Sequence, residues 1–508
     1  MSSAERVLNK IIGVIYTITI VYVIGLLLIA NFVDYSEFHK RHFVAPNVIL
    51  FAVGIILMLV AGRAIYKSNF SFKNRFTLPL IILIFTVIMA ICSLYRTGWD
   101  AGTVVSDTLN YAFGNDTELG YYSENPNNRL IFVILSSIFR VSIAIGITNR
   151  TVLYGIVVVI QCILFWLTGL IVRDIIYRIT EDKKTATFGY LLCSIFVTMS
   201  PWVIVAYTDC FGLIFPILVL WLFMIMPDDT TGKKIVKWLV LLTVALLGYQ
   251  IKTTAFVAYI AELCALFVSS FSEKKRAQML LDLAIFALNV IFLVPLFIKC
   301  EDFRFSTTMF ELYTDSKCDR EQELTPYHYF MMGLNEEYDG TFNFDDDTFS
   351  HYIQSYDERI SKEKKQIKIR LKSLGPWGVV KLYSKKLIID YNDGSYGYGL
   401  AGDEFVDDPL LEDAPWNIWA RFFTLPTHKG HPVYLNLMQI IWLGMIPFML
   451  FFKLKDKTNV SLALCLVGIT MFVLIFESQQ RYLFLYGPVY VIVAVIGLHN
   501  RLKATYKS

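Results

Sequence analysis

The stretch RLIFVILSSIFRVSIAIGI, residues 129–147, decides the topology of this chain. It is apolar and about as long as one bilayer crossing, which takes about 20 residues. Two arginines, Arg129 and Arg140, interrupt it. Directly before it, Pro126 followed by two asparagines predicts the start of a helix. Whether this helix crosses the membrane determines the side on which every later segment lies.

The composition of the whole chain indicates a membrane protein. Its 508 residues are 56% hydrophobic and 18% charged, and the mean hydropathy is +0.53. These values lie far outside the range of ordinary globular proteins. The net charge is only +3 and the basic residues are scattered, so the sequence shows no footprint for nucleic acid. We therefore predict an α-helical protein that crosses the membrane many times.

Besides residues 129–147, about 12 segments are long and apolar enough to cross the bilayer. We expect spans at 11–32, 47–66, 76–95, 152–175, 185–203, 210–227, 234–250, 253–271, 279–299, 433–452, 459–476 and 482–498. The first follows MSSAERVLNK and has no small-residue cleavage site. It is therefore interpreted as a span rather than as a signal peptide.

Basic residues between the spans indicate the orientation, because positively charged loops stay in the cytoplasm. They form six groups: Arg63, Lys67, Lys73 and Arg75; Arg178, Lys183 and Lys184; Lys233 and Lys234; Lys274, Lys275 and Arg276; Lys453, Lys455 and Lys457; Arg501, Lys503 and Lys507. All six fall on one side only if an even number of crossings separates Arg75 from Lys183. Residues 129–147 are therefore predicted to lie in the outer interface without crossing. Both termini are then cytoplasmic.

This topology places several polar residues together at the outer ends of their helices. They are Asp100, Asp107, Tyr121, Tyr122, Asn127, Asn128, Asp209, Lys252, Glu477 and Arg481. A transporter would tend to place its ionisable residues near the bilayer midplane. The long polar segment 301–431 lies on the same outer side, and its helical pattern with a Gly375–Pro376 break predicts an ordered, mainly helical domain.

Each of these residues also has a purely structural interpretation. Asp209 is equally suited to cap the helix that follows it. Lys252 lies between two apolar runs, so it either snorkels to the interface or meets an anion such as phosphate. Glu477 and Arg481 are four residues apart and can pair on one helical face. The planar guanidinium of Arg481 equally suits a phosphate.

Neither the cysteines nor the acidic residues predict a metal site. Most of the eight cysteines lie in apolar runs, and no CxxC pair is present. Cys300 and Cys318 either form a disulfide or remain two thiols. Three consecutive acids, Asp345 to Asp347, form a run that is typical of an acidic surface turn.

Several short motifs resemble those of the integral-membrane GT-C glycosyltransferases. They are GWDAGTVV at 98–105, YYSENPNN at 121–128, AYTD at 206–209, IKTT at 251–254 and ESQQRY at 477–482. More narrowly, they resemble the bacterial branch related to protein O-mannosyltransferases and aminoarabinose transferases. The outer stretches TPYHYFMMGLNEEYDGTFN, GPWGVVKLYSKKL and DGSYG resemble Gram-positive members of this branch that are linked to cell-wall polysaccharide decoration.

The resemblance implies a donor, a base and binding residues. The donor is a polyprenyl-phosphate-linked sugar, and Asp100 matches the general base on the acceptor hydroxyl, with Asp107 in reserve. Lys252, Arg481 and Arg129 are candidates to hold the donor phosphate. No cofactor and no metal are expected. The candidates for binding or orienting sugar and acceptor are Asp209, Glu477, Tyr121, Tyr122, Asn127, Asn128 and His328.

We therefore expect a GT-C-like transmembrane bundle with outer juxtamembrane helices. Residues 1–75 form two additional spans, 76–300 the core with a first outer loop at 96–148, 301–431 the extracytoplasmic domain and 432–508 the last spans. The expected function is sugar transfer to a cell-wall or surface polysaccharide at the outer face of a bacterial cytoplasmic membrane, with membrane lipid and glycan as partners. The alternatives are a polysaccharide polymerase or ligase, a lipid-linked glycan transporter and a glycan-binding scaffold.

Overall fold

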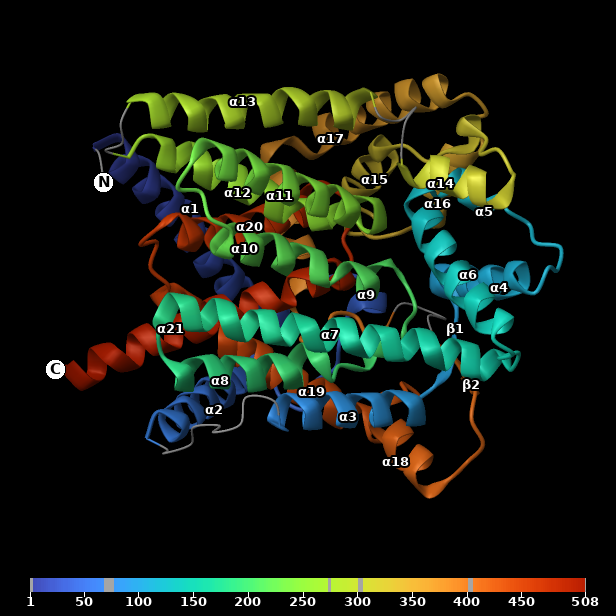
Figure 1. Ribbon diagram of the computed structural model, residues 1–508, viewed down its shortest axis with the longest axis horizontal. Coiled ribbons are helices and arrows are strands. Elements are labelled where there is room, and N and C mark those ends of the chain that lie inside the picture. The colour runs from blue at the N-terminus through green and yellow to red at the C-terminus, as the bar shows by residue number, and fades with distance from the viewer. Residues whose placement is uncertain (1–2, 68–76, 273–275, 300–304, 401–404, 508) are drawn as a thin grey trace.

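The computed structural model describes residues 3–67, 77–272, 276–299, 305–400 and 405–507. Long helices run side by side through most of the molecule, and shorter elements gather at one end of this bundle (Figure 1). Both termini lie at the opposite end (Figure 1). Four of the basic residues that were used for the orientation, Lys73, Arg75, Lys274 and Lys275, and the thiol of Cys300 lie outside the described residues.

Ten helical segments among the described residues are long and apolar enough to cross a membrane. They are Ser3–Phe32, Asn47–Ile65, Pro126–Ala144, Arg150–Thr180, Thr208–Ile225, Thr231–Ile251, Thr253–Ser270, His431–Phe451, Lys457–Ile475 and Gln480–Ala504. All but Pro126–Ala144 coincide with predicted spans. The prediction of a multi-pass helical membrane protein is thus confirmed in its general form.

The remaining three predicted spans are not among these ten segments. The segment 76–95 contains the shorter apolar helix α3, Thr77–Cys92. The segment 185–203 is not one helix, because α8 (Lys183–Cys193) passes into a π-helical turn and then into a short 3₁₀ helix at Pro201–Ile204. The segment 279–299 lies in α13, Arg276–Lys299.

The segment that decided the predicted topology forms α6, Arg129–Ala144. Figure 1 shows α6 running across the end of the bundle, whereas α7 (Arg150–Thr180) runs along it. Helices α4 (Trp99–Ala112) and α14 (Phe305–Thr314) pack against α6. Its composition alone would permit a crossing, but its direction is the one expected of an interfacial helix.

The other long helices make up the bundle. They are α1 (Ser3–Ile29), α2 (Asn47–Lys67), α10 (Ile214–Ile225), α11 (Thr231–Ile251), α12 (Val257–Ser270), α19 (His431–Met445), α20 (Lys457–Ile475) and α21 (Gly487–Lys507). The segment that contains α21, Gln480–Ala504, is the most enclosed, with 94% of its apolar window buried. It lies at the centre of the core.

The shorter elements lie at the end of the bundle where α6 is found. They include α5 (Tyr121–Glu124), α9 (Thr208–Gly212), α15 (Pro326–Gly333), α16 (Phe344–His351) and α18 (Pro415–Thr424). A two-stranded antiparallel sheet joins β1 (Tyr95–Thr97) to β2 (Phe405–Pro409). This sheet brings the start of α4 next to a segment about 300 residues later in the chain.

Helix α17, Tyr356–Tyr391, contains the predicted break at Gly375, where φ is 59°. Its second half packs against α1 and α20. At its end, the Tyr391 hydroxyl is hydrogen-bonded to the hydroxyls of Thr470 (2.6 Å) and Tyr490 (2.7 Å). The end of α17 therefore lies inside the bundle, although the sequence assigned all of 301–431 to an outer domain.

Candidate functional site

Asp100 lies in the first turn of α4, directly after β1. The preceding residue, Trp99, has a φ of 48°, a left-handed conformation that is rare for a bulky side chain. A Cβ at Gly102 would lie 2.2 Å from the Thr97 carbonyl oxygen, so only glycine fits there. The backbone thus turns sharply from strand to helix, and this turn fixes the position of Asp100.

The Asp100 carboxylate accepts hydrogen bonds from two tyrosines. The Tyr121 hydroxyl donates to Oδ1 at 2.8 Å, and the Tyr207 hydroxyl donates to Oδ2 at 3.2 Å. Asn128 Nδ2 in turn donates to the Tyr121 hydroxyl at 2.6 Å. Three of the predicted site residues and one further tyrosine are therefore connected.

Lys252 and Asp209 form a buried ion pair. Lys252 Nζ lies 2.8 Å from Asp209 Oδ1, and the two residues are only 8% and 1% exposed. Burial lowers the pKa of Lys252, while the nearby Asp209 carboxylate opposes that change. Lys252 lies between the end of α11 and a short 3₁₀ helix, Thr253–Phe256, so its position is fixed where α11 ends. Of the alternatives that the sequence left open for Lys252, the structure shows an anionic partner, the Asp209 carboxylate.

Arg481 brings a second cation to the same place. Its guanidinium carbon lies 5.9 Å from the ring centre of Tyr207 and 6.0 Å from that of Tyr482. Lys252 Nζ lies 5.9 Å and 5.1 Å from the same two rings. Two cations that share two aromatic rings repel each other, and an anion that binds between them is favoured electrostatically.

Glu477 completes the charged cluster. It is 6% exposed and accepts hydrogen bonds from Gln479 Nε2 at 3.0 Å and from the Tyr482 hydroxyl at 3.3 Å. Burial raises the pKa of Glu477, and the nearby Arg481 lowers it. We call Asp100, Tyr121, Tyr207, Asp209, Lys252, Glu477, Arg481 and Tyr482 the Asp100 cluster.

Two buried hydroxyl groups lie beside the Asp209–Lys252 pair in the sequence. Thr208 precedes Asp209, and Thr254 follows Lys252 by two positions. They are 0% and 2% exposed, and neither side-chain oxygen has a hydrogen-bond partner among the described residues. Because buried polar groups are normally hydrogen-bonded, such groups are available to a polar ligand.

Asp107 and Tyr122 lie beside the cluster rather than in it. The Tyr122 hydroxyl donates to Asp107 Oδ2 at 3.2 Å, two turns of α4 after Asp100. The Tyr122 ring is fully buried against Phe132 and Phe310. Asn127 contacts Asn128 through a long hydrogen bond of 3.4 Å. These residues shape the wall of the site.

Arg129 and His328 hold other parts of the structure. Arg129 donates to the carbonyls of Tyr122 and Ser123 and to Thr307, so its guanidinium ties the first outer loop to α14. His328 lies 2.8 Å from Ser350 Oγ in the core of the outer helices, and burial lowers its pKa to about 4. The contacts of both side chains are structural.

Three tyrosines of this region were not singled out from the sequence. Tyr207 lies within the AYTD motif and Tyr482 ends the ESQQRY motif. Tyr329, next to His328, is partly buried; desolvation of its hydroxyl raises its pKa, and the negative charges of Glu477 and Asp100 raise it further. This chain contains 29 tyrosines, so a tyrosine is not by itself evidence of a functional residue. The one signal in the sequence is that these three lie close to Asp209, Arg481 and His328.

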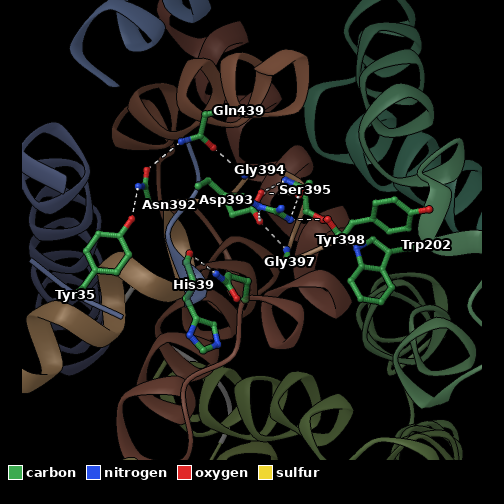
Figure 2. A network of polar contacts seen from close by, with 12 residues as sticks. Tyr35, His39, Trp202, Asn392, Asp393, Gly394, Ser395, Gly397, Tyr398 and Gln439 are labelled. Carbon is green, nitrogen blue, oxygen red and sulfur yellow. Dashed lines mark hydrogen bonds and ion pairs between the residues drawn. The ribbon is translucent and has the colours of Figure 1, made fainter. Parts of the chain in front are cut away.

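A second polar network is formed in the loop 392–398 (Figure 2). The Asp393 carboxylate accepts hydrogen bonds from Arg41 Nε at 2.9 Å, from the Ser395 amide at 2.8 Å and from the Gly397 amide at 2.9 Å. Gln439 Oε1 accepts one from the Gly394 amide at 2.8 Å. The loop is thus fixed by side chains from α19 and from the segment that precedes α2.

This loop contacts three of the segments that carry the cluster. Trp202 Nε1 donates to the Ser395 carbonyl at 2.9 Å, seven positions before Asp209. The hydroxyls of Tyr398 and Tyr95 are hydrogen-bonded, five positions before Asp100. A Cβ at Gly397 would lie 3.3 Å from Cβ of Gln480, the neighbour of Arg481. The loop therefore sets the relative positions of Asp100, Asp209 and Arg481.

Comparison with known proteins identifies the family of the chain. Among the described residues, no group of three or more His, Cys, Asp or Glu side chains is arranged to hold a metal ion. No curated protein and no solved structure matches the sequence. A family model described as "conserved hypothetical integral membrane protein" matches residues 4–501, which is nearly the whole chain. The chain therefore belongs to this family of integral membrane proteins.

Proposed function

We propose that this protein is a glycosyltransferase that moves a sugar from a polyprenyl-phosphate donor to a hydroxyl of an extracytoplasmic glycan, with Asp100 as the general base. The observation that carries the proposal is the position of Tyr207. Its hydroxyl donates to Asp100, while its ring lies within 6 Å of both Lys252 Nζ and the Arg481 guanidinium. A carboxylate and two cations from distant segments thus meet around one side chain.

The chemistry needs both kinds of group. The Asp100 carboxylate removes the proton of the acceptor hydroxyl as its oxygen attacks the anomeric carbon. The bond between that carbon and the phosphate oxygen breaks, and the electron pair leaves with the lipid phosphate. Lys252 and Arg481 stabilise the charge of this leaving group. The outcome at the anomeric carbon is inversion.

The hydroxyls around the cations suit the rest of the substrate. Thr208 and Thr254 are placed to donate to phosphate or sugar oxygens, since the described residues offer them no hydrogen-bond acceptor. Asp209 neutralises Lys252 in the ligand-free protein, and a bound phosphate would compete for the same ammonium. Glu477 and Tyr329 would face the sugar or the acceptor.

The proposal includes a location. The Asp100 cluster lies at the end of the bundle opposite the termini, and that end is the outer face in the orientation predicted by the basic loops. The membrane is proposed to be the cytoplasmic membrane of a bacterium, and the acceptor a cell-wall or surface polysaccharide.

The decisive experiment is sugar transfer by the purified protein from a synthetic polyprenyl-phosphate donor. Asp100→Asn should lower turnover by about 10²- to 10⁴-fold, because general base catalysis contributes that much. Asp116→Asn removes an exposed acid from the same outer loop and should leave turnover unchanged. Full activity in Asp100→Asn would overturn the base assignment. Turnover only with a lipid-diphosphate donor would favour a polymerase or ligase instead.

A further inference from the structure

Helix α18, with the sequence PWNIWARFFT, has two contrasting faces. Asn417, Ala420 and Arg421 are buried against the protein. The other face exposes Trp416 (65%), Ile418 (50%) and Trp419 (62%). Two tryptophans and an isoleucine on a short helix form an apolar surface that nothing in the described chain covers.

The polar contacts on the inner face fix the direction of the outer one. Arg421 donates to Asp413 Oδ1 at 2.7 Å and to the Leu411 carbonyl at 2.6 Å. Asn417 Nδ2 donates to the Glu412 carbonyl at 2.7 Å. Because these bonds hold the inner face of α18 against residues 411–413, the helix cannot turn its tryptophans inward without breaking them. The exposed face is therefore a fixed feature of the fold.

The neighbouring helix α3 indicates what covers this face. Helix α18 packs against α3 and α19, at the side of the bundle next to β1 and β2 (Figure 1). The outward side chains of α3 are about half exposed and wholly apolar, as expected for a surface that faces lipid: Leu80, Ile81, Ile84, Phe85 and Ile88. Helix α18, with its exposed apolar face, thus packs directly against a helix whose outward side is of the kind that faces lipid.

We propose that α18 lies in the headgroup region of the bilayer, with Trp416 and Trp419 inserted among the lipids. Tryptophan is enriched at that depth, because its ring is apolar and its indole N–H can still reach water or a headgroup. Interfacial helices usually present a charged face to water. In α18 that side is instead occupied by protein, so the helix joins the bundle to the lipid surface.

This position fixes the depth of the proposed site. The Thr424 hydroxyl, at the end of α18, donates to Ser93 Oγ at 3.1 Å, and β1 then leads to Asp100. A helix anchored in the headgroups therefore holds the Asp100 turn near the depth at which a lipid-linked phosphate lies. The lipid contact itself depends only on the membrane assignment and stands whether or not the protein transfers sugar.

Tryptophan quenching in phosphatidylcholine vesicles tests the proposal on the full-length protein. The fluorescence lost on changing both residues, Trp416→Phe and Trp419→Phe, is the signal of these two indoles. Lipids brominated near the headgroup should quench this signal about twofold more strongly than lipids brominated near the chain end. Since exposed indoles make few contacts, the double variant should unfold at the wild-type temperature.

Two results would overturn it. Quenching by aqueous acrylamide but not by brominated lipid would place α18 in water. Protection from both quenchers would mean that protein covers the face, either a second copy of this chain or a partner. None of these measurements uses a donor or an acceptor, so they separate the lipid contact from the proposed enzyme activity.

Discussion

The two polar networks at the same end of the bundle differ in how their buried charged groups are held. In the loop 392–398, the buried Asp393 carboxylate is bonded to two backbone amides and to Arg41 (Figure 2). In the Asp100 cluster, two cations share the same aromatic rings and two threonine hydroxyls have no hydrogen-bond partner among the described residues. A buried carboxylate held by backbone amides and a guanidinium rigidifies a fold, whereas a place where two cations lie close to the same rings is suited to an anionic ligand.

The difference teaches which substitutions should affect stability and which should affect function. Changes in the loop should lower the free energy of unfolding. Changes in the cluster should mainly lower turnover. Four variants, beginning with the one of largest expected effect on stability, test this division.

Asp393→Ala should lower the free energy of unfolding by about 3–5 kcal/mol, because it leaves the buried Arg41 charge without its carboxylate. Denaturant unfolding in detergent micelles measures this change. Asp229→Ala, which breaks an exposed pair with Lys233, is the matched control and should cost less than about 1 kcal/mol. Equal losses of unfolding free energy in the two variants would show that the loop contributes no more to stability than an exposed ion pair.

Lys252→Met should lower stability by about 3 kcal/mol, since the buried Asp209 loses its ion-pair partner. Adding Asp209→Asn removes the unpaired charge and should recover most of that loss. Turnover should stay low in both variants, because neither has the ammonium for the donor phosphate. Thermal unfolding and sugar transfer are measured on the same samples. Recovery of turnover in the double variant would show that Lys252 only neutralises the charge of Asp209 and does not bind the donor phosphate.

Tyr207→Phe should change stability by about 1 kcal/mol, the usual net contribution of one hydrogen bond. It should lower turnover by about tenfold, because the Asp100 carboxylate loses one of the two groups that orient it. Tyr111→Phe removes a comparable hydrogen bond, to the Tyr313 carbonyl, far from the carboxylate of Asp100. A similar loss of turnover in both variants would argue against an orienting role for Tyr207.

Asp107→Asn should have the smallest effect and should raise stability slightly. Burial raises the pKa of Asp107 above its usual value, because the charged form is disfavoured inside the protein. The charged carboxylate therefore lowers the free energy of unfolding, and this loss is complete once the pH exceeds the raised pKa. The gain in the variant should therefore be present at neutral pH and disappear below about pH 4. Unfolding midpoints at several pH values measure it. Loss of turnover in this variant would make Asp107, rather than Asp100, the base.

Much of the fold could be predicted because apolar length is visible in a sequence. The parity of basic loops even indicated that α6 would differ from the spans. The interruption after Cys193 was not visible, since a π turn followed by a 3₁₀ helix leaves the apolar run intact.

The return of α17 into the bundle was also missed, because its charged residues looked soluble. In the structure, Lys386 Nζ donates to the carbonyls of Gly333 and Leu474, and Asp390 accepts from Ser478 Oγ. These partners come from distant helices, so the sequence alone gives no sign that the charges are satisfied inside the protein.

The same limit applies to the candidate site. Asp100, Asp209, Lys252, Glu477 and Arg481 were singled out because ionisable residues at the ends of apolar spans are conspicuous, and the structure brings them close together. Arg129 and His328 looked equally conspicuous, yet backbone carbonyls and Ser350 hold them elsewhere. Only the packed structure distinguishes a charge that holds the fold together from one that faces the site.

The enclosure of α21 has a consequence for biosynthesis. Of the ten helical segments apolar enough to cross, the one that contains α21 is the most enclosed and also the last to leave the ribosome. The earlier spans must therefore enter the bilayer while the side of the bundle that α21 fills faces lipid or the insertion machinery. Tyr391 reaches its partner Tyr490 only when this last helix arrives. Assembly should thus pass through a long-lived open intermediate, the state most exposed to misassembly and to membrane proteases.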